Sequence, residues 1–205
     1  LSRWGQVLHR TFAGTENCSR PAWHHRRVRA PPGVLTVSPI DRAFGAVRLP
    51  GSKSISNRVL LLSALSDSEI ALVDLLDADD TRVMCNSLTT LGVQLHRSDA
   101  GLHVRGCNGR FPVREASLFL GNAGTAFRSL TAALAFSGGR YELDGVPRMR
   151  ERPIGDLVDA LNSIGARIRS TGLPGFPPLL IEPADRLSTD RVSIKADVSS
   201  QFLSG

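Results

Sequence analysis

The sequence has 205 residues, 41% of them hydrophobic, and a formal net charge of +6 at neutral pH. Residues 1–33 hold six arginines and one glutamate, which leaves 19 basic and 18 acidic residues for the rest of the chain. The near-neutral remainder excludes the dense basic face that binding to a nucleic-acid backbone requires. No apolar run approaches the roughly 20 residues of a membrane span. We therefore expect a protein that binds neither nucleic acid nor membrane.

Residues 1–33 show no apolar period and end in Pro-Pro-Gly, so we expect a disordered basic tail. A plastid transit peptide would also be rich in arginine and poor in acid, and upstream sequence carried along with a fragment is an equal alternative. His9, Cys18, His24 and His25 lie here, but their spacing matches no zinc motif. The three cysteines of the chain form no CxxC pair, which indicates free thiols in a reducing compartment.

From residue 34 onward, short β-rich runs alternate with helical periods, which is typical of an α/β protein. Asp79 and Asp80 suit the start of a helix, and Gly92 suits its end. The first unit is expected to contain a strand at 46–49, a helix at 54–66, a strand at 70–73, a helix at 79–91, and strands at 93–97 and 102–105.

The second unit repeats this order, so the fold is predicted as a series of β-α-β-α-β-β units. Its expected elements are a strand at 118–120, a helix at 123–136, a strand at 140–143, a helix at 153–164, and strands at 166–170 and 179–182. A third copy begins with a strand at 192–194 and a helix start near 199–201. Because the sequence stops at 205, we expect it to be a fragment.

The two units carry matching turns between their first strand and first helix. These turns read GSKSISNR at 51–58 and GNAGTAFR at 121–128, so the leading glycines, and likewise the closing arginines, are 70 residues apart. Helix N-termini present free N–H groups and a positive dipole end, which favour anions. The repeat therefore predicts a substrate with several phosphate or carboxylate groups.

Candidate anion ligands stand in and after these turns. Lys53 and Ser54 begin the first helix, and Arg58 follows Ser54 by one turn, so Ser54 and Arg58 are placed to hold one anion together. Gly124 has no Cβ and lets a ligand approach the backbone. Each residue also has a plainer explanation, namely an ordinary helix cap, a solvated cation or a simple turn.

A dense charge cluster, RMRERP, occupies residues 148–153 and follows a predicted strand. It precedes a helix that Pro153 is suited to begin at its first position. A solvated loop is the plainer explanation of three arginines around one glutamate. The place of the cluster after a strand end, however, puts it at the same edge as the two glycine turns.

Four motifs together resemble the 5-enolpyruvylshikimate-3-phosphate synthase family, the 3-phosphoshikimate 1-carboxyvinyltransferases. They are LPGSKS at 49–54, GNAGTAFR at 121–128, RMRERP at 148–153 and VSSQF at 198–202. The resemblance implies the enolpyruvyl transferase fold, an inverted α/β prism with two domains of three units each and the active site between them. Residues 34–50 would then begin the discontinuous domain 1, and 51–205 would be an incomplete domain 2 with units at 51–106 and 115–183 and a third from 190.

The resemblance also implies a reaction. The enolpyruvyl group of phosphoenolpyruvate is transferred to the 5-hydroxyl of shikimate 3-phosphate, with release of phosphate and without a metal or organic cofactor. Matching the motifs position by position gives the implied substrate-binding residues Lys53, Ser54, Arg58, Gly124, Arg152, Ser199, Ser200 and Gln201. In this assignment Lys53 and Gln201 contact both substrates, whereas Gly124 and Arg152 face phosphoenolpyruvate. The remaining four bind shikimate 3-phosphate.

This sequence departs from the family at two places. The family usually has proline after the arginine of the glycine motif, where this chain has Ser129, so we expect weaker inhibition by glyphosate than in a Ser129→Pro variant. The C-terminal part that supplies the family's proton-transfer carboxylates is absent, so no catalytic residue is assigned and the 205-residue chain alone should be inactive.

Three alternatives stay open at this point. The chain could be an anion-binding module of the same fold without catalysis, another enolpyruvyl transferase, or a nucleic-acid binder through its arginine tail. The UDP-N-acetylglucosamine enolpyruvyl transferases share the fold but have Lys-Asn where this chain has Lys53-Ser54. The resemblance further implies a monomeric full-length enzyme in a bacterial cytoplasm, or in a plastid if residues 1–33 are a transit peptide.

Overall fold

The computed structural model describes residues 39, 42, 44–47, 49–184, 191–194 and 200–203. Contacts divide the chain into two compact units, Leu1–Val47 and Arg48–Gly205. The expected tail at 1–33 and the predicted ligand Ser199 lie outside the described residues.

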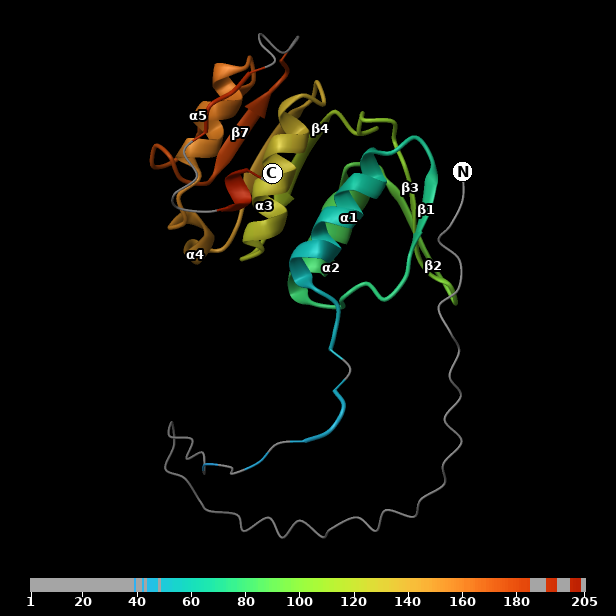
Figure 1. Cartoon of the computed structure of the whole chain (residues 1–205). Coiled ribbons are helices and arrows are strands. Elements are labelled where there is room, and N and C mark those ends of the chain that lie inside the picture. Colours follow the sequence, from blue (N-terminus) through green and yellow to red (C-terminus); the bar gives the residue numbers. More distant parts are fainter. Residues whose placement is uncertain are drawn as a thin grey trace, which may run out of the picture. The chain divides into compact units, whose positions relative to one another are not determined.

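The first repeat forms a three-stranded antiparallel sheet with two helices (Figure 1). In chain order its elements are α1 (Lys53–Leu65), β1 (Glu69–Leu72), α2 (Asp79–Thr90), β2 (Gln94–Ser98) and β3 (Gly101–Arg105). The strand order is β1-β3-β2, so the last strand of the repeat lies in the middle. Gly92 has a φ of 89°, a left-handed conformation that favours glycine, and it directs the chain from α2 into β2.

The second repeat forms a four-stranded mixed sheet. Its elements are β4 (Glu115–Phe119), α3 (Gly124–Ala135), β5 (Arg140–Asp144), α4 (Pro147–Arg150), α5 (Gly155–Ser163), β6 (Arg167–Ser170) and β7 (Leu179–Glu182). The order is β4-β5-β7-β6, with β4 parallel to β5 and the other pairs antiparallel. A short 3-10 helix, η1 (Ser200–Phe202), follows.

The helices join the two repeats into one core. Helix α3 packs against both α1 and α2, and α5 packs against α3 and β6. The strands alternate as expected for one buried face: Leu102 and Val104 of β3 are buried, as are Tyr141 and Leu143 of β5. Asn57 of α1 donates a hydrogen bond to Thr125 of α3, so the starts of these two helices lie side by side.

The prediction of a strand at 46–49 was wrong, because the described residues of this segment are in no strand. Val47 and Leu49 are 82% and 79% exposed, so the apolar run that suggested the strand buries little surface. Strand propensity yields a strand only where a neighbouring edge accepts its backbone hydrogen bonds. As a result, the described part of the first sheet has no counterpart of β4 beside β1.

Two further predictions differ from the structure: one expected strand is missing, and one helix begins later than expected. Residues 192–194, expected as the first strand of a third copy, are in no strand. The helix expected from Pro153 begins instead at Gly155, and the proline at a helix start is Pro147 of α4. The N–H groups of Ile154 and Gly155 both donate to the carbonyl of Gly175, at 2.9 and 3.0 Å, and this tertiary contact sets where α5 begins.

Candidate functional site

A hollow of about 580 Å³ lies where α1, α2 and α3 begin. Five residues that the sequence motifs predicted as ligands line it together: Lys53, Ser54, Gly124, Arg152 and Gln201. They come from two repeats and from η1, and up to 148 positions separate them in the sequence. The fold therefore gathers distant motifs at one polar hollow.

The first helix contributes a lysine that is already paired. Lys53 Nζ lies 3.3 Å from Asp80 Oδ1, and its side chain is 51% exposed. The N-cap of α1 is Ser52, whose hydroxyl accepts a hydrogen bond from the N–H of Ile55 at 3.4 Å. Part of the anion-binding capacity of this helix start is thus used within the protein itself.

The second helix begins at a glycine over which two guanidinium groups gather. A Cβ at Gly124 would lie 2.5 Å from Arg152 Nη1 and 3.2 Å from Arg128 Nη1. Only glycine leaves room for both groups so close to the backbone. The N-cap of α3, Ala123, forms no side-chain hydrogen bond. Two cations and a helix N-terminus consequently face the same space, an arrangement that favours an anion.

Arg128 is held firmly in this position. Its Nη1 donates to Gln201 Oε1 at 2.7 Å and its Nη2 to the carbonyl of Pro153 at 3.3 Å, while its guanidinium lies over the Phe202 ring. Burial lowers the pKa of Arg128, and the charge of Arg152 lowers it further. Among the described residues, neither arginine has a carboxylate partner. An anion here would compensate two neighbouring positive charges.

The RMRERP cluster separates into two paired arginines and one that faces the hollow. Arg150 donates two hydrogen bonds to Asp144, and Arg148 is paired with Glu151. Hydrogen bonds from Arg150 hold the pKa of Asp144 below its usual value. The Nη1 of Arg152 instead donates a hydrogen bond to the backbone carbonyl of Asn122 at 3.4 Å. These ion pairs anchor α4 and leave Arg152 available to a ligand.

A buried polar network connects the two helix starts. Asn57 Nδ2 donates to Thr125 Oγ1 at 2.7 Å, and Thr125 Oγ1 donates to Asp80 Oδ2 at 3.4 Å. Asn57 is almost fully buried, at 1% exposure. Together with the Lys53–Asp80 ion pair, this network fixes the relative position of the α1 and α3 starts.

Two of the predicted ligands lie elsewhere. Arg58 donates to the backbone carbonyl of Ser54 at 3.1 Å, not to its hydroxyl, and lines a separate hollow of about 300 Å³ between α1 and α3. Ser129 lines that second hollow too, and its hydroxyl donates to the carbonyl of Thr125 at 2.8 Å. Ser200 is exposed in η1 and does not line the larger hollow.

Residue-by-residue reasoning from the sequence missed Asn57, Asp80, Thr125 and Arg128 as parts of the site. Arg128 had a usable signal, because it keeps the register of Arg58 in the repeated turn. Asp80 was interpreted as a helix-start residue, which it is, but its carboxylate also faces Lys53.

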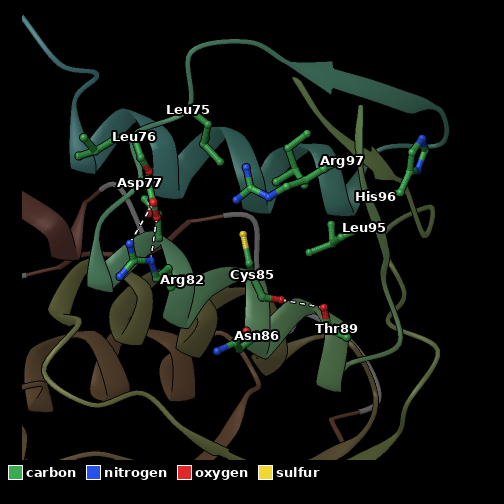
Figure 2. Close-up of a pocket in the computed structure, with 12 residues that line it drawn as sticks. Leu75, Leu76, Asp77, Arg82, Cys85, Asn86, Thr89, Leu95, His96 and Arg97 are labelled. Atoms are coloured by element: carbon green, nitrogen blue, oxygen red, sulfur yellow. Dashed lines mark hydrogen bonds and ion pairs between the residues drawn. The ribbon is translucent and has the colours of Figure 1, made fainter. Parts of the chain in front are cut away.

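A different hollow, of about 380 Å³, lies between α2 and β2 (Figure 2). Two arginines, Arg82 and Arg97, line it, and Arg82 forms two hydrogen bonds to Asp77, at 2.8 and 2.9 Å. Cys85 points into this hollow, and burial raises the pKa of its thiol, which disfavours the reactive thiolate. Unlike the site at the helix starts, this hollow is lined by none of the residues that the sequence motifs predicted as ligands.

Known proteins resemble this chain in sequence and fold. The profile of the family described as EPSP synthase (3-phosphoshikimate 1-carboxyvinyltransferase) matches residues 37–205. The chain is 59% identical over 169 residues to a 3-phosphoshikimate 1-carboxyvinyltransferase from Cupriavidus taiwanensis, covering 82% of this chain and 39% of that relative. It is 60% identical over 170 residues to the enzyme of that name from Cellvibrio japonicus, covering 82% of this chain and 40% of the relative.

The fold also resembles that of a solved structure. An EPSP synthase structure from Acinetobacter baumannii superimposes with a TM-score of 0.66 at 24% identity, covering 78% of this chain and 37% of that one. The chain thus spans about two fifths of the length of the curated relatives that it matches. Because the family profile matches residues 37–205, most of the chain, the chain belongs to the EPSP synthase family.

Proposed function

We propose that this chain is the substrate-binding part of an enzyme that transfers the enolpyruvyl group of phosphoenolpyruvate to the 5-hydroxyl of shikimate 3-phosphate. The observation that carries the proposal is the convergence of Lys53, Arg128 and Arg152 on one hollow at the starts of α1 and α3. Both substrates are polyanions, and each requires cations and free N–H groups for its phosphate and carboxylate. The relatives' names support the reaction class.

The two helix starts suit different substrates. Gly124 and Arg152 would hold phosphoenolpyruvate, because two guanidinium groups without carboxylate partners lie there. Lys53 and Ser54 would hold shikimate 3-phosphate from within the hollow, and Arg58, Ser199 and Ser200 would complete its site from outside the described lining. Lys53 and Gln201 would stand between the ligands and contact both. In this arrangement the cations offset charge as the new C–O bond forms and the C–O bond to phosphate breaks.

The proposed domain division follows from this function. Residues 34–50 would begin domain 1, and 51–205 would be an incomplete domain 2, with further chain completing the cleft and supplying the groups that move protons. We also propose that the full-length protein acts as a monomer in the bacterial cytoplasm. Size-exclusion chromatography would test the first of these two statements, and fractionation of the host cell the second.

Phosphate release by the full-length protein tests the reaction. We expect release only when both substrates are present, and none from the 205-residue chain alone. An anion-binding module of the same fold would bind the substrates without releasing phosphate. A chain specific for another acceptor would release phosphate from phosphoenolpyruvate with UDP-N-acetylglucosamine in place of shikimate 3-phosphate. Either result would contradict the proposal.

A further inference from the structure

The outer face of the first sheet carries three metal-ligating side chains, one from each strand. Glu69 comes from β1, His96 from β2 and His103 from β3. His96 and His103 are direct cross-strand partners, and Glu69 lies opposite Arg105, two residues along β3 from His103. Side chains alternate along a strand, so these three share the face opposite the one that buries Leu102 and Val104.

The ligand atoms of the three residues converge. Glu69 Oε1 lies 3.3 Å from His103 Nδ1 and 3.8 Å from His96 Nε2, and all three residues offer ligand atoms within 4.8 Å of one another. Atoms bound tetrahedrally to Zn²⁺ at about 2.0–2.1 Å lie roughly 3.4 Å apart. The distances from Glu69 Oε1 to the two histidine nitrogens are thus close to those between zinc ligands, and no backbone movement is needed to reach them.

A serine is placed to set the tautomer of one ligand. His103 Nε2 lies 2.9 Å from Ser98 Oγ, which also accepts a hydrogen bond from the N–H of Ala100 at 3.1 Å. If His103 donates to Ser98 through Nε2, its Nδ1 lone pair faces the Glu69 carboxylate. In the other tautomer the Ser98 hydroxyl donates to Nε2 and the Nδ1–H faces Glu69, and a metal ion at Nδ1 would take the place of that proton. Outer hydrogen bonds of this kind are usual for histidine metal ligands.

The corresponding position of the second sheet already holds a cation. Arg140 begins β5 as Glu69 begins β1, and each of these strands pairs with the last strand of its repeat. Arg140 lies within 4.0 Å of the carboxylates of Glu115, Glu142 and Glu182. In the first sheet, the recorded ion-pair partners of Glu69 among the described residues are His96 and His103. The first sheet thus has two imidazoles and one carboxylate where the second sheet has one arginine surrounded by three carboxylates.

We propose that Glu69, His96 and His103 bind a divalent transition-metal ion of the Zn²⁺ class. Two imidazoles and one carboxylate suit Zn²⁺, Ni²⁺ or Cu²⁺ better than Mg²⁺ or Ca²⁺, which prefer oxygen ligands alone. The side chains of Glu69 and His96 are 48% and 57% exposed, so an ion reaches them from solvent and keeps water in its remaining positions. None of the three lines the hollow at the helix starts, so the ion has no part in the proposed reaction.

Binding requires one movement. The His96 and His103 rings are stacked, with centroids 4.5 Å apart and planes inclined by 14°. A nitrogen lone pair lies in the plane of its ring, so two stacked rings do not direct both lone pairs at one ion. His103 is only 22% exposed and is bonded to Ser98, whereas His96 is open to solvent. We therefore expect the His96 ring to turn out of the stack.

Calorimetric titration of Zn²⁺ alone into the full chain tests the proposal. The chain should carry His9→Gln, His24→Gln, His25→Gln and Cys18→Ser, because these residues offer competing ligands. We expect one ion per chain, and nuclear magnetic resonance of the imidazole nitrogens should show both remaining histidines shifting. His96→Gln or Glu69→Gln should weaken binding by about 100-fold, and Ser98→Ala by roughly 10-fold.

The matched control is Glu115→Gln, which removes a carboxylate from the outer face of the second sheet and should leave Zn²⁺ affinity unchanged. Thermal unfolding without Zn²⁺ shows whether each variant folds; His96→Gln is exposed and should unfold at the parent temperature. Equal Zn²⁺ affinity in folded His96→Gln and parent chains would overturn the proposal. Loss of all binding on changing the four N-terminal residues would overturn it as well.

Discussion

The starts of α1 and α3 occupy the same place in the two repeats, yet they offer an anion different things. At α1 the N-cap serine satisfies a backbone N–H, and Lys53 is paired with Asp80. At α3 the N-cap alanine forms no side-chain hydrogen bond, and two guanidinium groups lie over Gly124. The two repeats therefore share the position of the turn but not its charge balance. We thus expect the second turn to bind an anion more strongly than the first.

The largest effect should come from Gly124→Ala. Its new Cβ would lie 2.5 Å from Arg152, so the guanidinium groups would have to move. Misplacing a substrate by about 1 Å costs on the order of 100-fold in rate, so we expect such a loss in kcat/KM of the full-length protein for phosphoenolpyruvate. Gly172→Ala is the control, because its Cβ would meet Pro178 at an ordinary 3.4 Å. Equal losses in both variants would contradict the role of Gly124.

Arg152→Lys tests whether the planar guanidinium group of Arg152 is needed, or only its positive charge. Lysine keeps the positive charge but cannot form paired hydrogen bonds, so KM for phosphoenolpyruvate should rise roughly 10-fold to 100-fold. Arg148→Lys, in the same cluster but paired with Glu151, should leave KM unchanged. If Arg148→Lys raised KM as much as Arg152→Lys, the separation of the cluster into structural and ligand-binding arginines would be wrong.

Asp80→Asn addresses the first turn and should have a smaller effect. The amide oxygen still accepts from Thr125, but the charge that pairs with Lys53 is removed. Because a partly exposed ion pair contributes about 0.2–1 kcal/mol, affinity for inorganic phosphate should rise by up to about 5-fold. Asp67→Asn, which removes an exposed carboxylate outside the hollow, is the control in phosphate titrations. Weaker phosphate binding by Asp80→Asn would mean that Asp80 orients Lys53 rather than competing for it.

The smallest expected effect is a change in the stability of the folded chain at acid pH, through Asp144. Arg150 and the Gly145 N–H lower the pKa of Asp144 in the folded chain. The resulting stabilisation is therefore present above the unfolded value of about 3.9 and is lost as the pH falls below it through the lowered pKa. Unfolding temperature measured against pH should fall less steeply in Asp144→Asn than in the parent over this acid range. Parallel curves would indicate that the pair contributes nothing to stability.

Local signals in the sequence located most helices and strands. The acidic start of α2 and the glycine after it lie where the structure places them, since caps act through neighbouring residues alone. The strand at 46–49 and the start of α5 were wrong, because both depend on partners distant in sequence: a sheet edge in one case and the Gly175 carbonyl in the other.

The site was predictable where motifs carried it and not where side chains cross between repeats. Lys53, Gly124 and Arg152 stand in recognisable motifs and do line one hollow. The Asn57–Thr125 contact joins residues 68 apart, and no local pattern indicates it. His96 and His103 had an overlooked signal, because a tight hairpin between their strands makes them cross-strand neighbours.

In the described part of the first sheet, β1 is an edge strand that pairs only with β3. An uncovered strand edge presents backbone donors and acceptors that another chain can pair with. Solutions of this chain should therefore associate through edge-to-edge contacts at high concentration. A charged residue at Ala71, in the middle of β1, is the substitution to try first when preparing it for crystallisation.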